Sequence, residues 1–109
     1  MNLNAYLIDF DLIEREFVAV GVAQKQLIRN NQKLRLVEFS KGFFEEHWCL
    51  KGHVGYVLSG EMKLLFRDKV VFFKPGNALW IDAGEENQHK MRLIDDQTVC
   101  LLLFESIEG

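Results

Sequence analysis

Residues 54–66 contain two alternating apolar runs joined by a Ser-Gly turn, and similar short runs recur along most of the chain. Gly, Asn and Asp residues separate these runs, which is typical of short β-strands linked by turns. The predicted strands cover residues 17–23, 26–28, 33–39, 46–49, 55–58, 61–66, 70–73, 79–81, 89–94 and 98–104. Short strands at this spacing predict a barrel or a sandwich. Only residues 9–16 suggest a helix, of one or two turns, because Asp11 and Glu14 form a weak capping box.

The length and composition indicate one globular unit. We expect the 109 residues to form a single domain, 1–109, with the barrel core at about residues 17–104. A hydrophobic content of 49% and a charged content of 27% are those of a soluble globular protein.

Charge and cysteine content argue against several classes of protein. The net charge is −3 and the chain has no basic stripe, so we expect no nucleic-acid partner. The longest apolar run, residues 99–104, is far too short to span a membrane, and the N-terminal residues do not resemble a signal peptide. Two cysteines without Cys-x-x-Cys spacing are too few for a disulfide framework. We therefore expect a cytoplasmic protein in a reducing setting, with no membrane partner.

All three histidines and one of the cysteines lie near the best-defined turns. His47, Cys49 and His53 precede the run at 54–66, and His89 follows the second Gly-bearing turn. Because His47 and Cys49 are two residues apart, both face the same side if their strand is regular. A small barrel with inward His and Cys side chains holds either a site or a costly buried polar cluster.

These residues make the chain resemble the cupins, small β-barrel proteins with two sequence motifs. Tyr56–Glu61 reads YVLSGE and matches the end of the first motif. Counting back from Gly60, His47 matches the first ligand histidine of that motif. Cys49 occupies the place of the second histidine, and His53 that of a glutamate. With His in place of Glu, the site would retain more positive charge and favour an anionic guest.

The second motif is also present in altered form. Residues 75–76 supply its Pro-Gly turn, while Asn77 replaces the usual Asp and Asp82 the usual Pro. Asn87 stands where the motif has its histidine, and His89 lies two residues further on. Because positions 87 and 89 share parity, a slightly longer turn would bring His89 to the same side.

The resemblance covers about residues 34–104 and implies an all-β fold: a cupin-type double-stranded β-helix, or jelly-roll barrel, with a short irregular N-terminal arm. It also implies a homodimer, since such barrels commonly pair, often by exchange of N-terminal strands. Closed two-fold dimers are in any case the commonest oligomers. Cupins include oxygenases, isomerases, sugar epimerases, sensor domains and storage proteins, so the fold does not choose an activity.

The metal-ligand hypothesis has open alternatives. His47, His53 and His89 are predicted to surround a divalent transition metal, and imidazole suits Fe, Mn, Ni, Cu and Zn alike. The alternative is a set of barrel-mouth histidines that bond to backbone or to an organic molecule, with no metal. Cys49 is a fourth candidate ligand, a redox-active thiol, or a small apolar filler.

Three further residues are candidates for binding a ligand. Arg35, flanked by two leucines, would meet an acidic or carbonyl group if it points inward, and otherwise is a solvent-facing charge. Asn87 is either a turn residue or a hydrogen-bond donor to the ligand. Trp80 is either a lining residue or part of the core or an interface.

The sequence therefore favours a small-molecule site with a divalent transition metal in a barrel, with oxygenase or isomerase-type chemistry as its catalytic form. The alternative is a non-catalytic module that binds a sugar, carboxylate or other metabolite without metal. A third reading is an interaction protein with a vestigial pocket. Whether the protein is an enzyme stays open from the sequence.

Overall fold

The computed structural model describes residues 6–107, which fold into antiparallel β-structure. The strands in this range are β1 (Glu16–Ala19), β2 (Val22–Arg29), β3 (Gln32–Phe39), β4 (His53–Ser59), β5 (Met62–Phe66), β6 (Val70–Phe73), β7 (Ala78–Ile81), β8 (His89–Leu93) and β9 (Val99–Ser106). Two single-turn 3₁₀ helices, η1 (Phe10–Leu12) and η2 (Glu85–Asn87), complete the elements. No helix in the described part of the chain is long and apolar enough to cross a membrane.

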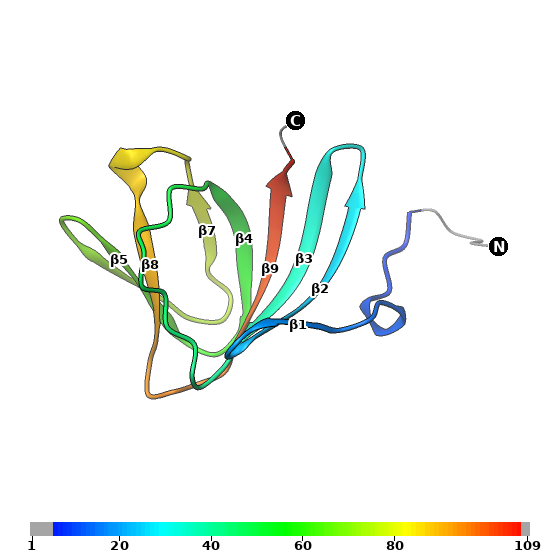
Figure 1. Ribbon diagram of the computed structural model, residues 1–109, viewed down its shortest axis with the longest axis horizontal. Coiled ribbons are helices and arrows are strands. Elements are labelled where there is room, and N and C mark those ends of the chain that lie inside the picture. The colour runs from blue at the N-terminus through cyan, green and yellow to red at the C-terminus, as the bar shows by residue number, and fades with distance from the viewer. Residues whose placement is uncertain (1–5, 108–109) are drawn as a thin grey trace.

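Two sheets face each other across the interior (Figure 1). The larger has the order β1-β2-β3-β9-β4-β7, and the smaller has the order β6-β5-β8. Strands distant in sequence are neighbours, because β9 pairs with both β3 and β4. The predicted all-β barrel class is confirmed, and β9 is the strand that closes the middle of the large sheet.

The core lies between the two sheets and follows the alternation of the strands. In β9, Val99, Leu101 and Leu103 are buried, and the residues between them face outward. Met62 and Leu64 of β5 approach from the opposite sheet and are equally buried. Burial of such side chains supplies the main driving force for folding, at roughly 25 cal/mol for each Å² removed from water.

Two turns show how the sequence sets the register of the strands. Asn30 and Asn31 both have positive φ, 52° and 61°, which produces the tight two-residue turn between β2 and β3. Gly60 has φ of 78°, and a Cβ there would collide with the carbonyl of Thr98. The Ser-Gly turn is thus a place where only glycine fits.

The predicted strand at 46–49 does not form. In this segment the backbone makes a single bridge, from Cys49 to His89 on the free edge of β8. One reason is that the Glu45 side chain takes the next backbone donor, since its Oε1 accepts from Met91 N at 2.8 Å. A carboxylate thus occupies the position on β8 that a backbone carbonyl would use in a continued ladder.

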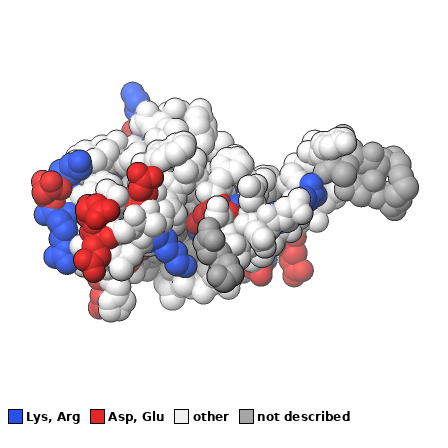
Figure 2. Space-filling view, turned by 90° about the horizontal axis from the view of Figure 1, so that it is seen from above, with Lys and Arg blue, Asp and Glu red and all other residues white. Residues whose placement is uncertain are grey.

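The N-terminal arm, residues 6–15, leaves the barrel beside β1 (Figure 1). The predicted helix at 9–16 is reduced to η1, in which Asp9 Oδ1 accepts from the Asp11 backbone N–H at 3.0 Å. Large apolar side chains of the arm and of β1 face solvent, with Leu12 84% and Phe17 77% exposed. On the face shown in Figure 2, charged side chains of both signs gather mainly at the end opposite the arm.

Candidate metal centre

Cys49, His53 and His89 meet inside the barrel. One donor atom from each lies within 4.8 Å of the other two, so the three residues could hold a metal ion. The bridge between Cys49 and His89 creates this meeting, through backbone bonds of 2.8 and 3.1 Å in the two directions. His53 joins them as the first residue of β4.

Both imidazole rings are oriented by partners on their Nδ1 atoms. His53 Nδ1 lies 3.0 Å from Glu105 Oε2, and its Nε2 is 3.7 Å from the Cys49 sulfur. His89 Nδ1 lies 2.9 Å from the Asn87 carbonyl oxygen. Such outer partners fix the tautomer and direction of metal-ligating histidines. The Nε2 atoms are therefore the ones left to bind at this site.

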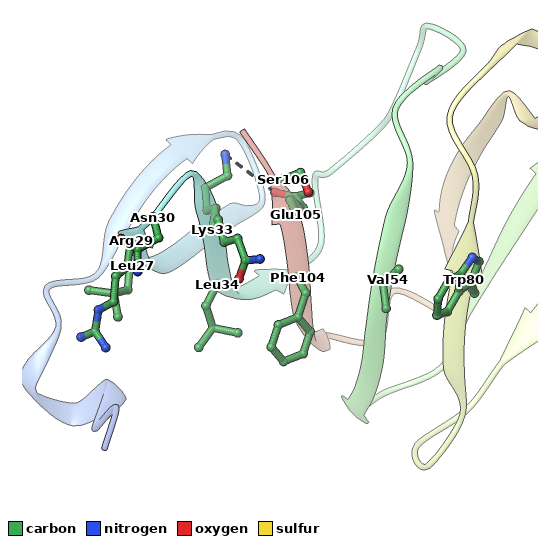
Figure 3. Close-up of a pocket in the computed structure, with 11 residues that line it drawn as sticks. Leu27, Arg29, Asn30, Lys33, Leu34, Val54, Trp80, Phe104, Glu105 and Ser106 are labelled. Atoms are coloured by element: carbon green, nitrogen blue, oxygen red, sulfur yellow. Dashed lines mark ion pairs between the residues drawn. The ribbon is translucent and has the colours of Figure 1, made fainter. Parts of the chain in front are cut away.

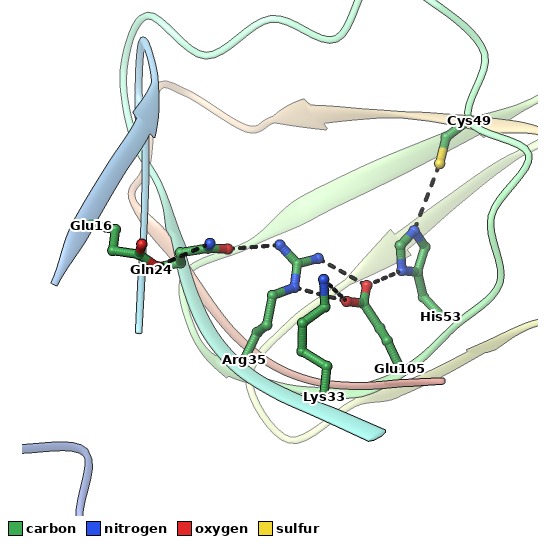
Figure 4. Close-up of polar contacts among 7 residues, drawn as sticks. All are labelled: Glu16, Gln24, Lys33, Arg35, Cys49, His53 and Glu105. Atoms are coloured by element: carbon green, nitrogen blue, oxygen red, sulfur yellow. Dashed lines mark hydrogen bonds and ion pairs between the residues drawn. The ribbon is translucent and has the colours of Figure 1, made fainter. Parts of the chain in front are cut away.

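A chain of polar contacts supports His53 from behind (Figure 4). Arg35 holds Glu105 with two bonds, Nε to Oε1 at 2.9 Å and Nη2 to Oε2 at 2.8 Å. Arg35 Nη1 donates to Gln24 Oε1 at 2.9 Å, and Lys33 Nζ lies 3.7 Å from Glu105 Oε1. A bidentate arginine–carboxylate pair is geometrically specific, so this network restrains the Glu105 carboxylate and with it the His53 ring.

The group is strongly polarised. A hydrogen bond from His53, reinforced by His89, lowers the pKa of the Cys49 thiol from 9.0 to about 6. Burial opposes charge on His53, but its bonds to Cys49 and Glu105 outweigh that effect and raise its pKa from 6.5 to about 9. The pKa of His89 is also raised, because its bonds to Cys49 and to the Asn87 carbonyl outweigh burial. Without a metal, the arrangement is a thiolate held by imidazolium.

Glu105 is the fixed negative charge behind this pair. Burial favours its neutral form, but the bonds from His53 and Arg35 prevail and lower its pKa from 4.5 to about 2. Its side chain is 12% exposed. Glu105 therefore stays ionised over the whole range in which Cys49 and His53 titrate.

The donor set fits a divalent transition metal. Thiolate favours Zn and Cu(I), and imidazole suits Zn, Cu, Fe and Ni. A set of two Nε2 atoms and one sulfur leaves a coordination position free, as catalytic metal sites require. Cys49, His53 and His89 line an interior cavity of about 270 Å³ together with residues of both sheets, so a bound molecule could reach a metal held there.

His47, the first predicted ligand, does not join the group. Its side chain is 92% exposed, and its Nε2 lies 3.5 Å from Glu46 Oε2 at the surface. The prediction that His47 and Cys49 share a direction assumed a regular strand, and residues 46–49 do not form one. The prediction that all three histidines converge is therefore wrong for His47.

The three predicted ligand-binding residues have different positions. Arg35 points inward and lines the cavity, but it is engaged with Glu105 and Gln24. Asn87 contributes its backbone carbonyl to His89, as described above. Trp80 is 76% exposed, because Leu79 and Ile81 on either side of it take the inward positions of β7.

Trp80 belongs to an apolar row on the outer face of the large sheet (Figure 3). Cross-strand pairing places Trp80 beside Val54, Val54 beside Phe104, and Phe104 beside Leu34. A groove of about 480 Å³ runs along this row. Trp80 thus lies on the side of the sheet away from the candidate metal centre.

The sequence analysis did not predict Glu105 as a site residue, although the alternation of the last strand indicates it. The predicted last strand stopped at residue 104, while the alternation that buries Leu101 and Leu103 continues to position 105. A charged residue at an inward position of a barrel strand requires a partner, and Arg35, at an inward position of β3, was already a candidate. Glu45, which also lines the cavity, was not among the predicted site residues either.

No family model matches the sequence, and a search of curated proteins finds no match. Solved structures do resemble it. A polyketide cyclase, RemF from Streptomyces resistomycificus, is 23% identical with a TM-score of 0.79, over 96% of this chain and 81% of that one. A cupin-superfamily sugar phosphate isomerase from Silicibacter pomeroyi is 18% identical with a TM-score of 0.76, over 94% of this chain and 76% of that one.

A third solved structure is also similar to this chain. It is an RmlC-like cupin with a double-stranded β-helix from Methanocaldococcus jannaschii, 16% identical with a TM-score of 0.62, over 86% of this chain and 89% of that one. The chain has the cupin fold. Identities this low show the fold alone, so the chemistry of this cupin barrel must be argued from Cys49, His53, His89 and their surroundings.

Proposed function

We propose that this cupin barrel binds a small molecule beside a divalent transition metal held by Cys49, His53 and His89. The observation that carries the proposal is the convergence of one sulfur and two imidazoles within 4.8 Å, with both Nδ1 atoms already bonded elsewhere. Neither ring can turn its Nδ1 inward without losing a hydrogen bond, which costs about 1 kcal/mol or more.

Each residue has a role in this proposal. Cys49 supplies a negative ligand, while Glu105 accepts from His53 Nδ1 and so leaves His53 Nε2 to bind the metal. The metal, when bound, supplies a Lewis acid that polarises a ligand oxygen. The apolar wall of the cavity keeps water away from the bound molecule, which strengthens the electrostatic interactions at the site.

Metal titration tests the proposal. Chelator-treated, reduced protein is titrated with Fe(II), Mn, Ni, Cu and Zn, followed by calorimetry and elemental analysis. We expect about one ion per chain, and at least about a hundredfold weaker binding in Cys49→Ala and His89→Ala. The matched control is His47→Ala, which removes an imidazole outside the group and should bind as the wild type does. Binding no tighter than millimolar for every ion would contradict the proposal.

A second candidate is a metabolite-binding module that needs no metal. The contact of 3.7 Å between the Cys49 sulfur and His53 Nε2 favours it, because thiolate and imidazolium neutralise each other without an ion. Binding of a small molecule, measured with metal-free and with metal-loaded protein, separates the two candidates. Tight binding of a small molecule by metal-free protein, unchanged on adding metal, would favour the second.

Catalysis of an isomerase or oxygenase type is the enzymatic form of the first proposal. Glu45 supports it, since this carboxylate lines the cavity and is restrained by Met91 N. A carboxylate held beside a bound molecule is suited to proton transfer. Solvent deuterium incorporation into bound ligands, lost in Glu45→Gln with metal binding retained, would be the evidence for an isomerase.

We also propose that two chains pair as a homodimer in a reducing, cytoplasmic setting. The apolar row through Trp80 and Phe104, together with the exposed arm, supports pairing, because patches of this kind usually mark interfaces.

The reducing setting is supported by the cysteines. Both are free thiols, and Cys49 must remain reduced to act as a ligand. Oxidation of Cys49 with a mild disulfide reagent should therefore abolish metal binding.

A further inference from the structure

The chemistry of the interior cavity narrows the class of molecule that it binds. The cavity measures about 270 Å³, and ten of its fifteen lining residues are apolar. Cys49, His53 and His89 lie at one end. Phe39 lines the other end, about 13 Å further along β3 from Arg35 at about 3.3 Å per residue, and Phe43 packs against it.

The polar side chains in the wall already have partners within the protein. Arg35 donates from Nε and Nη2 to Glu105 and from Nη1 to Gln24. Glu45 accepts from Met91 N through Oε1, which leaves its second oxygen. Two further N–H groups of Arg35, one on Nη1 and one on Nη2, have no partner among these bonds. Among the described lining side chains, hydrogen-bonding capacity for a guest is thus concentrated at the candidate metal centre, at Arg35 beside it and at that one oxygen.

This distribution disfavours a sugar or another polyhydroxylated guest. Each hydroxyl group placed against the apolar wall would lose its hydrogen bonds to water without replacement, and that loss weakens binding. An apolar body would instead gain free energy in proportion to the area that it buries. Phe39 and Phe43, whose ring centroids are 4.7 Å apart, offer an aromatic surface for such a body.

The size of the cavity limits the guest as well. An apolar cavity of about 150 Å³ holds one benzene molecule, which is about 25 Å³ per non-hydrogen atom. At that ratio the cavity has room for about 11 such atoms, or one substituted ring.

The charge beside the centre favours an anionic group on the guest. Lys33 and Arg35 both lie against the single carboxylate of Glu105, so the region beside the centre has an excess positive charge.

We propose that the cavity binds a compact, largely apolar molecule the size of one substituted ring, whose single carboxylate faces Cys49, His53 and His89. The placement of the carboxylate rests on the proposed metal function, whereas the preference for an apolar body rests on the cavity wall alone. This chemistry sets the guest apart from the phosphorylated and polyhydroxylated sugars that the fold also accommodates.

Two probes of equal size test the preference. 3-Phenylpropionate and xylonate have the same number of non-hydrogen atoms and one carboxylate each, but only the first has an apolar body. Calorimetry with zinc-loaded and with metal-free protein should show 3-phenylpropionate binding at least about a hundredfold more tightly in both. Equal binding, or tighter binding of xylonate, would overturn the inference. If the protein takes up no zinc, only the metal proposal is contradicted. The preference for an apolar body is still measured with the metal-free protein.

A pair of variants places the ring in the cavity. Leu101→Phe fills the interior from β9, while Leu102→Phe adds the same atoms on the other side of that strand. We expect Leu101→Phe to weaken 3-phenylpropionate at least about tenfold with zinc affinity retained, and Leu102→Phe to bind within about twofold of wild type. Leu64→Phe fills the cavity from the opposite sheet and repeats the test independently of β9. Unchanged binding in both cavity-filling variants would show that the ring lies elsewhere.

Discussion

At the scale of single residues, Glu105 connects the fold to the candidate metal centre. Its carboxylate accepts from Arg35 on one side and meets His53 on the other, at 2.8 and 3.0 Å. The charge on Glu105 therefore has two effects. It stabilises the packed barrel by its ion pair with Arg35, and it raises the basicity of His53, which is a proposed metal ligand.

Replacing Glu105 by Gln separates these effects from simple packing. We expect Glu105→Gln to lower the pKa of His53 from about 9 toward its ordinary range, because one of the bonds that raise it loses its charge. Unfolding at neutral pH should become easier by about 2 kcal/mol, since Arg35 is left without a charged partner. Histidine NMR titration of metal-free protein and urea unfolding measure these changes. Glu46→Gln, at a 79% exposed side chain, is the control that should change neither.

The same pair of proteins should converge in acid. The pKa of Glu105 is lowered in the folded state, so its contribution is complete above about pH 4.5 and is lost as pH falls toward 2. The difference in unfolding free energy between wild type and Glu105→Gln should therefore shrink from pH 4.5 to pH 2. A difference that stays constant over this range would show that Glu105 acts only through its shape.

Metal affinity should depend on pH through His53 rather than Cys49. With a pKa of about 6 the Cys49 thiol is already ionised at pH 7.5, whereas His53, at about 9, must release a proton before it can bind. Zinc affinity should thus increase from pH 6.5 to pH 9. Calorimetry at pH 7.5 in buffers of different ionisation enthalpy should show release of about one proton from His53, with any further release from His89. No release would mean that His53 is not a ligand.

At the scale of elements, alternation in the sequence predicts direction well where a strand pairs on both sides. β9 pairs with β3 and β4, and its inward residues follow every second position as far as Glu105. Residues 46–49 make one bridge only, so parity there carries no information and His47 was misplaced. A single sequence gives no sign of this difference, because it depends on Glu45 reaching the edge of β8.

Neighbouring leucines of β9 provide a measure of this alternation. Leu101 is 4% exposed in the core, while Leu102 lies on the outer face between the same two strands. We expect Leu101→Ala to lower the free energy of unfolding by about 2–5 kcal/mol, since it enlarges an interior space. Leu102→Ala should cost about half of that or less. Urea unfolding of metal-free protein compares the two, and equal losses would contradict the alternation observed in β9.

At the scale of the whole molecule, the large sheet has two distinct faces. Its inner face packs against the small sheet and carries Arg35 and Glu105 near the proposed centre. Its outer face carries the apolar row from Trp80 to Leu34 (Figure 3). The apolar side chains of the inner face are buried in the core and stabilise the single chain. Those of the outer row stay exposed in that chain.

The proposed homodimer would cover this row if the two chains paired through their outer faces. We expect size-exclusion chromatography with light scattering to give the mass of two chains, and the pair Trp80→Asp and Phe104→Asp to give mostly single chains, because each variant buries a charge at the contact. Phe72→Asp is the matched control, since Phe72 is 65% exposed on β6 of the other sheet and should leave the dimer intact. Zinc affinity should be unchanged in the outer-face variants, as they lie away from Cys49. Dissociation by Phe72→Asp alone would place the contact on the small sheet instead.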